Sequence, residues 1–237
     1  MSQAAAEVHW TGRTGPFDFA VNPGVFAPTH TSRTIAEALD VTANDTVIDV
    51  GCGSGVLSFV AARLGAKRVV GCDISEEAVE VARRNATRLG LADRVEFRVG
   101  SLLDPVRDVS ADVLIGDVSG IPDAIAEVAG WFPDGHAGGP TGAELPSAML
   151  ESIGDTLRVG GRLYLPTGTI QDEHTILAKA RELFGERMQP VIERDFPLPD
   201  VVGKSLAVAR MMKEGLLNLQ RRGSRFLWRL RVWRCER

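Results

Sequence analysis

The sequence lacks the features that would place it in a membrane or outside the cell. None of its uncharged apolar stretches approaches the roughly 18–20 residues that a membrane-spanning helix requires. The N-terminus, MSQAAAEVHW, shows no basic start followed by an apolar run, so the pattern of a signal peptide is missing. Cysteine is rare, and the spacing of Cys52, Cys72 and Cys235 matches neither a disulfide framework nor a zinc site. We therefore expect a cytoplasmic protein with reduced thiols and no metal ion.

The chain also lacks the excess of basic residues that proteins binding nucleic acid usually carry. Its 237 residues hold 27 Lys and Arg against 31 Asp and Glu, a formal net charge of −4. Seven arginines lie in residues 214–237, so the preceding chain is strongly acidic. An acidic body is poorly suited to binding RNA, which makes a nucleic-acid partner unlikely. We expect these arginines to line the solvated margin of a final strand that buries Trp228, Leu230 and Val232.

From Asp45 onward, apolar runs of strand length alternate with segments of helical periodicity. Residues 46–50 (TVIDV) form a nearly continuous apolar run, as expected for a strand buried on both faces. Ser75, followed by two glutamates, is typical of a helix start, and Gly90 is typical of its end. This alternation predicts a parallel sheet covered by helices. We expect strands at 46–50, 67–72, 94–99, 111–115, 162–166, 189–196 and 224–235, and helices at 56–64, 75–89, 123–129, 145–157 and 172–184.

Two segments interrupt this alternation. Residues 116–142 are rich in glycine and proline, and a loose connection of this length inside a domain is usually functional. Residues 197–222 are expected to form an insertion for the substrate, partly helical from 208 to 219. We divide the chain into an N-terminal segment, 1–44, which includes a helix at 31–39 and is expected to cover a ligand site, and a main α/β domain, 45–237.

The first predicted strand leads directly into a glycine-rich loop. Gly51, Gly53 and Gly55 allow the backbone to turn sharply and to approach a ligand closely at the start of a helix. Asp73 lies at the end of the next strand, where a carboxylate can accept both hydroxyls of a ribose. Asp49 adds a second acid, which favours a positively charged ligand. Together these elements predict a nucleoside-type ligand.

These residues resemble those of class I S-adenosylmethionine-dependent methyltransferases. The similarity lies in VIDVGCGSG at 47–55, VVGCDIS at 69–75 and LRVGGRLYL at 157–165, and it extends over residues 45 to 195. It implies a doubly wound, Rossmann-like α/β fold with three layers, a mostly parallel sheet of seven strands and an antiparallel last strand. The implied cofactor is S-adenosyl-L-methionine. The residues implied to bind it in this region are Asp49, Gly51, Cys52, Gly53, Gly55, Asp73, Ile74, Ser101, Leu102 and Asp117.

The segment before the sheet extends the resemblance. Residues 22–32 (NPGVFAPTHTS) are similar to a segment of the group that includes release-factor glutamine, ribosomal-protein and rRNA-base methyltransferases. Residues 138–144 also resemble a stretch of the release-factor enzymes. In that group a hydroxyl-rich turn starts a helix near the methionine carboxylate. The resemblance implies cofactor contacts from Phe26, Thr29 and Thr31, although the hydroxyls could equally be plain helix caps.

One motif departs from this group. The amide and base methyltransferases carry Asn/Asp-Pro-Pro-Tyr/Phe after the fourth strand, where the polar side chain and a proline carbonyl hold a planar NH2 and the ring stacks on it. Residues 117–120 here are Asp-Val-Ser-Gly. Asp117 keeps the acceptor, but the prolines and the ring are absent. We predict that Asp117 positions or deprotonates the acceptor, with His136 in the loose connection and His30 before the sheet as further candidates for the base.

Three functions remain compatible with these residues. We expect methyl transfer to a nitrogen, oxygen or carbon atom of a small molecule, because the cofactor motifs are intact while the acceptor motif is altered. A protein or RNA methyltransferase is the alternative, based on the resemblance and the arginine-rich end. A non-methylating enzyme that converts S-adenosylmethionine on the same fold is a third reading. We expect no membrane partner, and a homo-oligomer is left open.

Overall fold

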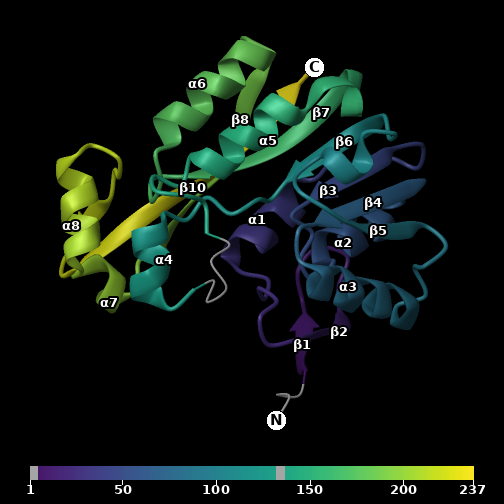
Figure 1. Cartoon of the computed structure of the whole chain (residues 1–237), viewed down its shortest axis with the longest axis horizontal. Helices are drawn as coiled ribbons and strands as arrows, with labels where there is room; N and C mark the ends of the chain where they lie inside the picture. The colour runs from purple at the N-terminus through teal and green to yellow at the C-terminus, as the bar shows by residue number, and fades with distance from the viewer. Residues whose placement is uncertain (1–4, 132–136) are drawn as a thin grey trace.

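The computed structural model describes residues 5–131 and 137–237, which form an eight-stranded sheet with helices on both faces (Figure 1). The strand order is β5-β4-β3-β6-β7-β10-β8, and the short β9 pairs with β10. The strands are β3 (Thr46–Val50), β4 (Arg68–Asp73), β5 (Val95–Val99), β6 (Ala111–Gly116), β7 (Leu157–Gly168), β8 (Met188–Pro197), β9 (Gln220–Arg222) and β10 (Arg225–Glu236).

The direction of the strands confirms the predicted fold class. β3 pairs in parallel with both β4 and β6, β4 with β5, and β6 with β7. The last strand, β10, is antiparallel to both of its long neighbours, β7 and β8. The first strand of this sheet, β3, therefore lies in its interior, and later strands are added on both sides of it. In such sheets a ligand binds beyond the carboxyl ends of the strands, where the winding reverses.

Two apolar cores hold the layers together. On one face, α1 (His30–Ala38), α2 (Val56–Leu64) and α3 (Glu76–Arg88) bury side chains such as Ile35 and Phe59 against the sheet. On the other face, α5 (Glu144–Ser152) and α6 (Glu173–Phe184) pack through Met149 and Phe184, helped by the 3-10 turns η1 (Asp104–Val106) and η2 (Gly154–Thr156). The three layers keep the strand ends in fixed positions relative to one another.

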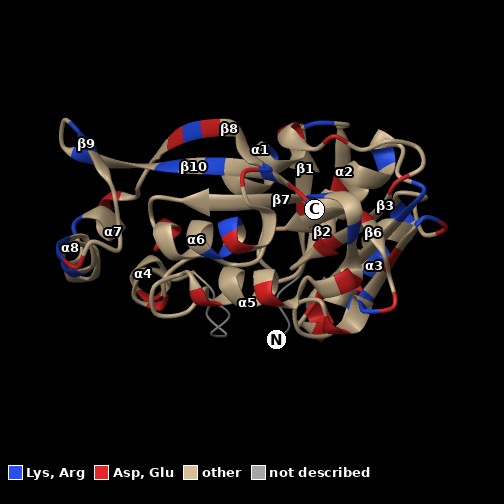
Figure 2. Ribbon diagram, turned by 90° about the horizontal axis from the view of Figure 1, so that it is seen from above, with Lys and Arg blue, Asp and Glu red and all other residues tan. Residues whose placement is uncertain are grey.

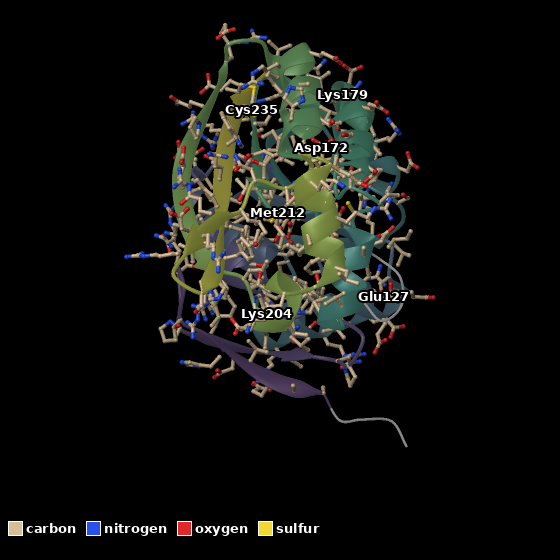
Figure 3. The ribbon with its side chains drawn as sticks, turned by 90° about the vertical axis from the view of Figure 1, so that its left-hand side faces the viewer. Glu127, Asp172, Lys179, Lys204, Met212 and Cys235 are labelled. Atoms are coloured by element: carbon tan, nitrogen blue, oxygen red, sulfur yellow. The ribbon has the colours of Figure 1, made fainter. Side chains whose placement is uncertain are left out.

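A third, smaller core lies beside the sheet. It joins α4 (Asp123–Ala129) to the two short helices α7 (Asp200–Gly203) and α8 (Leu206–Lys213) through residues such as Ile125 and Val208. Figure 3 shows α8, which carries Met212, and α7, which is followed by Lys204, next to the helix that carries Glu127. The insertion expected at 197–222 is thus helical at 200–203 and 206–213, earlier than the predicted 208–219.

The N-terminal segment contains a β-hairpin that the sequence analysis does not predict. β1 (Ala6–Trp10) and β2 (Phe17–Val21) pair in an antiparallel two-stranded sheet. Trp10 and Phe19 are fully buried in the same core as α2 and α3. The buried Asn85 amide of α3 holds the hairpin by donating to the Ala20 carbonyl and accepting from the Ala20 amide, each at 2.9 Å. The alternating apolar residues of 17–21 were the signal for it.

The arginine-rich segment divides into two parts. Arg229 and Arg231 form ion pairs with Asp195 and Glu173, each with an N–O distance of 2.7 Å, and Figure 2 shows the basic residues of β10 beside the acidic residues of β8. Leu230 and Val232 are buried as predicted, whereas Trp228 is only half-buried because it faces a cavity. Around the β9–β10 turn the arginines are exposed; they are Arg221, Arg222 and Arg225.

Within residues 5–131 and 137–237, no helix combines the length and the apolar character needed to cross a bilayer. The same residues gather no group of three or more His, Cys, Asp or Glu that could hold a metal ion.

Candidate functional site

A cavity of about 620 Å³ lies at the carboxyl ends of the central strands. Its wall includes the residues that directly follow β3, β5 and β6, and the ends of β4 and β7. The N-terminus of α1 covers it, and parts of β8 and β10 extend it beyond the strand ends. This volume is in the range of small-molecule and cofactor sites, which hold a ligand in a concave, mostly apolar pocket.

The glycine-rich loop connects β3 to α2 and forms the inner wall. The amides of Gly51 and Cys52 donate to the Cys72 carbonyl at 2.8 and 3.0 Å, which folds the loop against the end of β4. Gly51 has φ +74°, and a Cβ there would lie 2.9 Å from the Asp117 carbonyl oxygen. Only glycine fits this conformation and this close contact. The loop therefore brings the ends of β3, β4 and β6 together.

Gly53 and Asp73 lie side by side at the cavity wall. The Gly53 amide donates to Asp73 Oδ2 and the Ser75 amide donates to Asp73 Oδ1, each at 2.9 Å. These bonds fix the carboxylate while leaving lone pairs free for a ligand, because each oxygen can accept two hydrogen bonds. A Cβ on Gly53 would meet a single protein atom within 4 Å, the Phe26 carbonyl oxygen at 3.8 Å. There is room for a ligand beside this glycine.

Asp49 is fully buried beneath the loop. Its Oδ2 accepts a hydrogen bond from Ser58 Oγ at 2.6 Å, whereas its Oδ1 has no hydrogen-bond partner among the residues that the structure describes. Burial raises the pKa of this carboxyl to about 6, with a smaller contribution from the charge of Asp73. A buried carboxylate oxygen without a partner is costly unless a donor or a positive charge satisfies it. The arrangement suits a cationic ligand at the loop.

Asp117 follows β6 and faces the cavity from the next strand. Its Oδ2 accepts from Ser32 Oγ at 3.4 Å, and Ser32 also caps α1 by accepting from the Thr29 amide at 3.5 Å. The side chain keeps partial exposure to the cavity, but the protein around it raises its pKa to about 7. Desolvation is the main cause, and the nearby charge of Asp49 adds to it. At neutral pH this carboxyl exists in both protonation states.

Twelve of the thirteen residues predicted for cofactor binding line the cavity, and Gly55 does not. Phe26 and Ile74 are 46% and 56% exposed, unusual values for large apolar side chains at such a site. Leu102 has φ +49°, and its carbonyl accepts from the Cys72 thiol at 3.0 Å. The others at the cavity are Thr29, Thr31, Asp49, Gly51, Cys52, Gly53, Asp73, Ser101 and Asp117. Gly55 faces the core instead, because a Cβ there would meet the rings of Phe59 and Phe97.

The predicted catalytic histidines differ in position. His136 lies outside the described residues. His30 begins α1 at the cavity, and its ring stacks on Phe196 with the centroids 4.8 Å apart.

The outer half of the cavity was not predicted in detail. Its wall includes Phe196 of β8 and Trp228 of β10, together with Gly168 and Gln171 from the end of β7 and the residues after it. Gln171 is 6% exposed, and within residues 5–131 and 137–237 its Nε2 has no hydrogen-bond partner. The alternation of apolar and polar residues in 224–235 predicts a strand. The pairing of β10 with β8 is needed to show that the rings of Phe196 and Trp228 reach the cavity.

A family model for the methyltransferase domain matches residues 41–193, well over half of the chain. The chain belongs to this methyltransferase family. The methyltransferase is a class I enzyme, and its cofactor is S-adenosyl-L-methionine, with which a similar solved structure was determined. The residues present fit that cofactor, since the unpartnered Asp49 Oδ1 suits a cation and the space beside Gly53 suits a close ligand.

Several relatives of the methyltransferase are named for protein substrates. It is 34% identical over 197 residues to a release factor glutamine methyltransferase of Moorella thermoacetica, covering 79% of this chain and 67% of the relative. A ribosomal protein L11 methyltransferase of Shouchella clausii is 30% identical over 193 residues, covering 78% and 53%. A second L11 enzyme, from Aeromonas hydrophila, is 40% identical over 104 residues, covering 41% and 35%. The chain spans about a third to a half of these L11 enzymes.

Solved structures show the same fold. A ribosomal protein L11 methylase from Lactobacillus delbrueckii has a TM-score of 0.55 at 20% identity, covering 92% of this chain and 84% of the other. A geranyl diphosphate methyltransferase in complex with SAM also scores 0.55, at 17% identity, covering 87% and 84%. Because proteins this distant share the fold but differ in acceptor, the fold alone does not identify the substrate.

Proposed function

We propose that this methyltransferase acts on a polypeptide and transfers the methyl group of S-adenosyl-L-methionine to a nitrogen atom of that substrate. The observation that carries the proposal is the 34% identity to a release factor glutamine methyltransferase over 67% of its length. The relatives named for ribosomal protein L11 add support. These similarities favour a protein acceptor over the small molecule that the sequence analysis puts first.

In this proposal the inner half of the cavity holds the cofactor. Asp73 accepts the ribose hydroxyls, because loop amides already orient its carboxylate. Asp49 attracts the positive charge from beneath the loop. The adenine lies among the exposed apolar side chains and Ser101, and the α1 cap residues Thr29 and Thr31 are near the methionine end. When bound, the sulfonium supplies an electrophilic methyl group for an in-line displacement.

Asp117 acts on the acceptor nitrogen. A carboxyl with an ordinary pKa of 3.8 is a weak base at neutral pH, whereas one with a pKa of about 7 can take a proton from an attacking group. Ser32 orients the carboxyl from α1. The cavity around it holds both reactants in line, and this alignment supplies much of what a displacement at carbon requires. His136 stays the second candidate for the base.

The test follows a radiolabelled methyl group from S-adenosyl-L-methionine into fractions of a lysate of the organism that encodes the chain. We expect acid-precipitable label that protease removes and ribonuclease does not. Asp73→Ala should reduce labelling through the cofactor, and Asp117→Ala through the acceptor, while Glu127→Gln on the surface of α4 serves as a control. Ribonuclease-sensitive label, or label only in the small-molecule filtrate, would refute a protein substrate. Consumption of S-adenosylmethionine without any labelled acceptor would indicate an enzyme that converts this cofactor without methylating another molecule.

A further inference from the structure

The turn that follows β6 carries no aromatic ring at residues 117–120. Gly120 stands where the resembling amide and base enzymes carry their stacking ring. A Cβ on Gly120 would lie 2.4 Å from Gln171 Oε1, and Gln171 is itself buried. The Gln171 amide therefore occupies the space into which a ring at position 120 would project. If this cavity stacks its acceptor group, the ring must come from another element.

Three rings from other elements meet at the cavity. His30 of α1 and Phe196 of β8 are stacked, with centroids 4.8 Å apart and an interplanar angle of 17°. Phe196 and Trp228 of β10 are 5.5 Å apart at 38°. All three residues line the cavity; His30 is exposed, and the other two are half-buried. We name these three residues the ring wall. Partial exposure toward a cavity leaves aromatic surface available to a ligand.

The fold positions the ring wall through the sheet. Trp228 and Phe196 are direct partners in the antiparallel pairing of β10 with β8, so their side chains share one face. Gly168 of β7 lies under the indole, because a Cβ at this position would be 2.9 Å from Trp228 Cζ3. Any larger residue at 168 would displace the indole. The wall thus depends on three adjacent strands rather than on a flexible loop.

The charges around the cavity restrict its ligands. Among the described residues that line it there are three carboxyl groups, Asp49, Asp73 and Asp117, and no lysine or arginine. An anionic acceptor, such as a phosphate or carboxylate, would find no lysine or arginine among these residues and would face three carboxyl groups. Aromatic faces attract planar groups by offset stacking and by the area they bury. A neutral planar group therefore satisfies both constraints.

We propose that the ring wall of His30, Phe196 and Trp228 is the acceptor platform of this enzyme and binds a neutral planar group by stacking. Such a group is either a side-chain amide or an aromatic ring. The inference rests on the proposed function, because it concerns the acceptor of the methyl transfer. It replaces the ring missing from the turn at 117–120 with rings from α1, β8 and β10.

Ligand-observed NMR with S-adenosylhomocysteine present tests this proposal without a known substrate. One probe pair is benzyl alcohol against cyclohexylmethanol, a planar against a puckered ring. The other is N-acetylglutamine methylamide against N-acetylmethionine methylamide, with and without a planar side-chain amide. We expect the planar member of one pair to bind more tightly than its non-planar counterpart. Tighter binding of benzyl alcohol would indicate an aromatic acceptor, and tighter binding of N-acetylglutamine methylamide would indicate a side-chain amide. Phe196→Leu and Trp228→Leu should each weaken that probe about three- to tenfold.

Two further variants keep the test decisive. Phe184→Leu, a matched change in the core of the other face, should leave probe binding unchanged. Gly168→Ala keeps all three rings but displaces the indole, and it should also weaken the probe, which covers the case in which a ring variant does not fold. Equal binding of planar and puckered probes, or no effect of the ring variants and Gly168→Ala, would overturn the proposal. Because the probes bind without methyl transfer, this result is separate from the labelling test for a protein substrate.

Discussion

Replacing Asp117 with asparagine should change how the stability of the protein depends on pH. The folded protein raises the pKa of this carboxyl from 3.8 to about 7. The folded state therefore keeps the proton over a range in which the unfolded chain has lost it. By linkage, the free energy of unfolding of the wild type falls as pH rises from about 4 to 7. Asparagine does not ionise, so the free energy of unfolding of the Asp117→Asn variant should lack the decrease with pH that Asp117 causes.

The size of the effect follows from the pKa values. Each pH unit between the unfolded and the folded pKa is worth about 1.4 kcal/mol, which gives an upper limit of about 4 kcal/mol for Asp117. The side chain keeps partial exposure to the cavity, and water there screens the charge. We therefore expect Asp117→Asn to be more stable than the wild type by about 2 kcal/mol at pH 8.5, and about equal at pH 4.

Urea denaturation without cofactor, measured at several pH values, checks this expectation. Asp195→Asn is the matched control, because its ion pair with Arg229 lowers the pKa of Asp195. That variant should lose stability at neutral pH, with a difference from the wild type that stays constant between pH 5 and 8.5. Asp49→Asn should reduce the effect of Asp117→Asn, since the charge of Asp49 contributes to the raised pKa.

Parallel stability curves for Asp117→Asn and the wild type from pH 4 to 8.5 would refute this reasoning. They would mean that the carboxyl ionises in the folded protein as it does in water. Asp117 could then still orient an acceptor, but it would be too weak a base to take its proton at neutral pH.

Three other substitutions or measurements test the site. Asp73→Ala should weaken S-adenosylmethionine binding by roughly 2–3 kcal/mol in calorimetry, and an unchanged affinity would mean that the cofactor lies elsewhere. Asp117→Ala should lower turnover by about 100-fold with little change in cofactor affinity, whereas a wild-type rate on an identified substrate would direct the next test to His136. RNA should bind weakly in a filter assay, because Arg229 and Arg231 are paired with carboxylates; tight binding that falls steeply with salt would contradict this.

The sequence predicts the central sheet well because its strands are buried on both faces. The strand at 46–50 and the helix at 123–129 have the predicted bounds. β7 begins at Leu157, five residues before the predicted strand, since residues 158–160 are exposed and show no apolar pattern. The alternation in residues 17–21 is too short to predict the hairpin of β1 and β2 by itself, and the residue that holds it, Asn85 of α3, lies 65 positions from Ala20.

The two halves of the cavity differ in how far the sequence reveals them. The half proposed to hold the cofactor consists of strand ends and the residues that follow them, so the motifs around Asp49, Asp73 and Asp117 predict residues that line it. The outer half depends on the pairing of β8 with β10 across the sheet, a contact between residues more than 30 positions apart. A pattern of alternating residues identifies such a strand but not its neighbour, so Phe196 and Trp228 could not be assigned to one wall.

The position of β10 between β7 and β8 has a consequence for the order of folding. β8 is made before β10, but among the described residues it has no other partner in the sheet. During synthesis β8 must therefore wait, unpaired, until residues 225–236 have left the ribosome. Non-local pairing of this kind is slow, and a waiting edge strand is prone to wrong partners. β8 carries the charged residues Glu193, Arg194 and Asp195. Their charges should make β8 a poor template for aggregation while it has no partner strand.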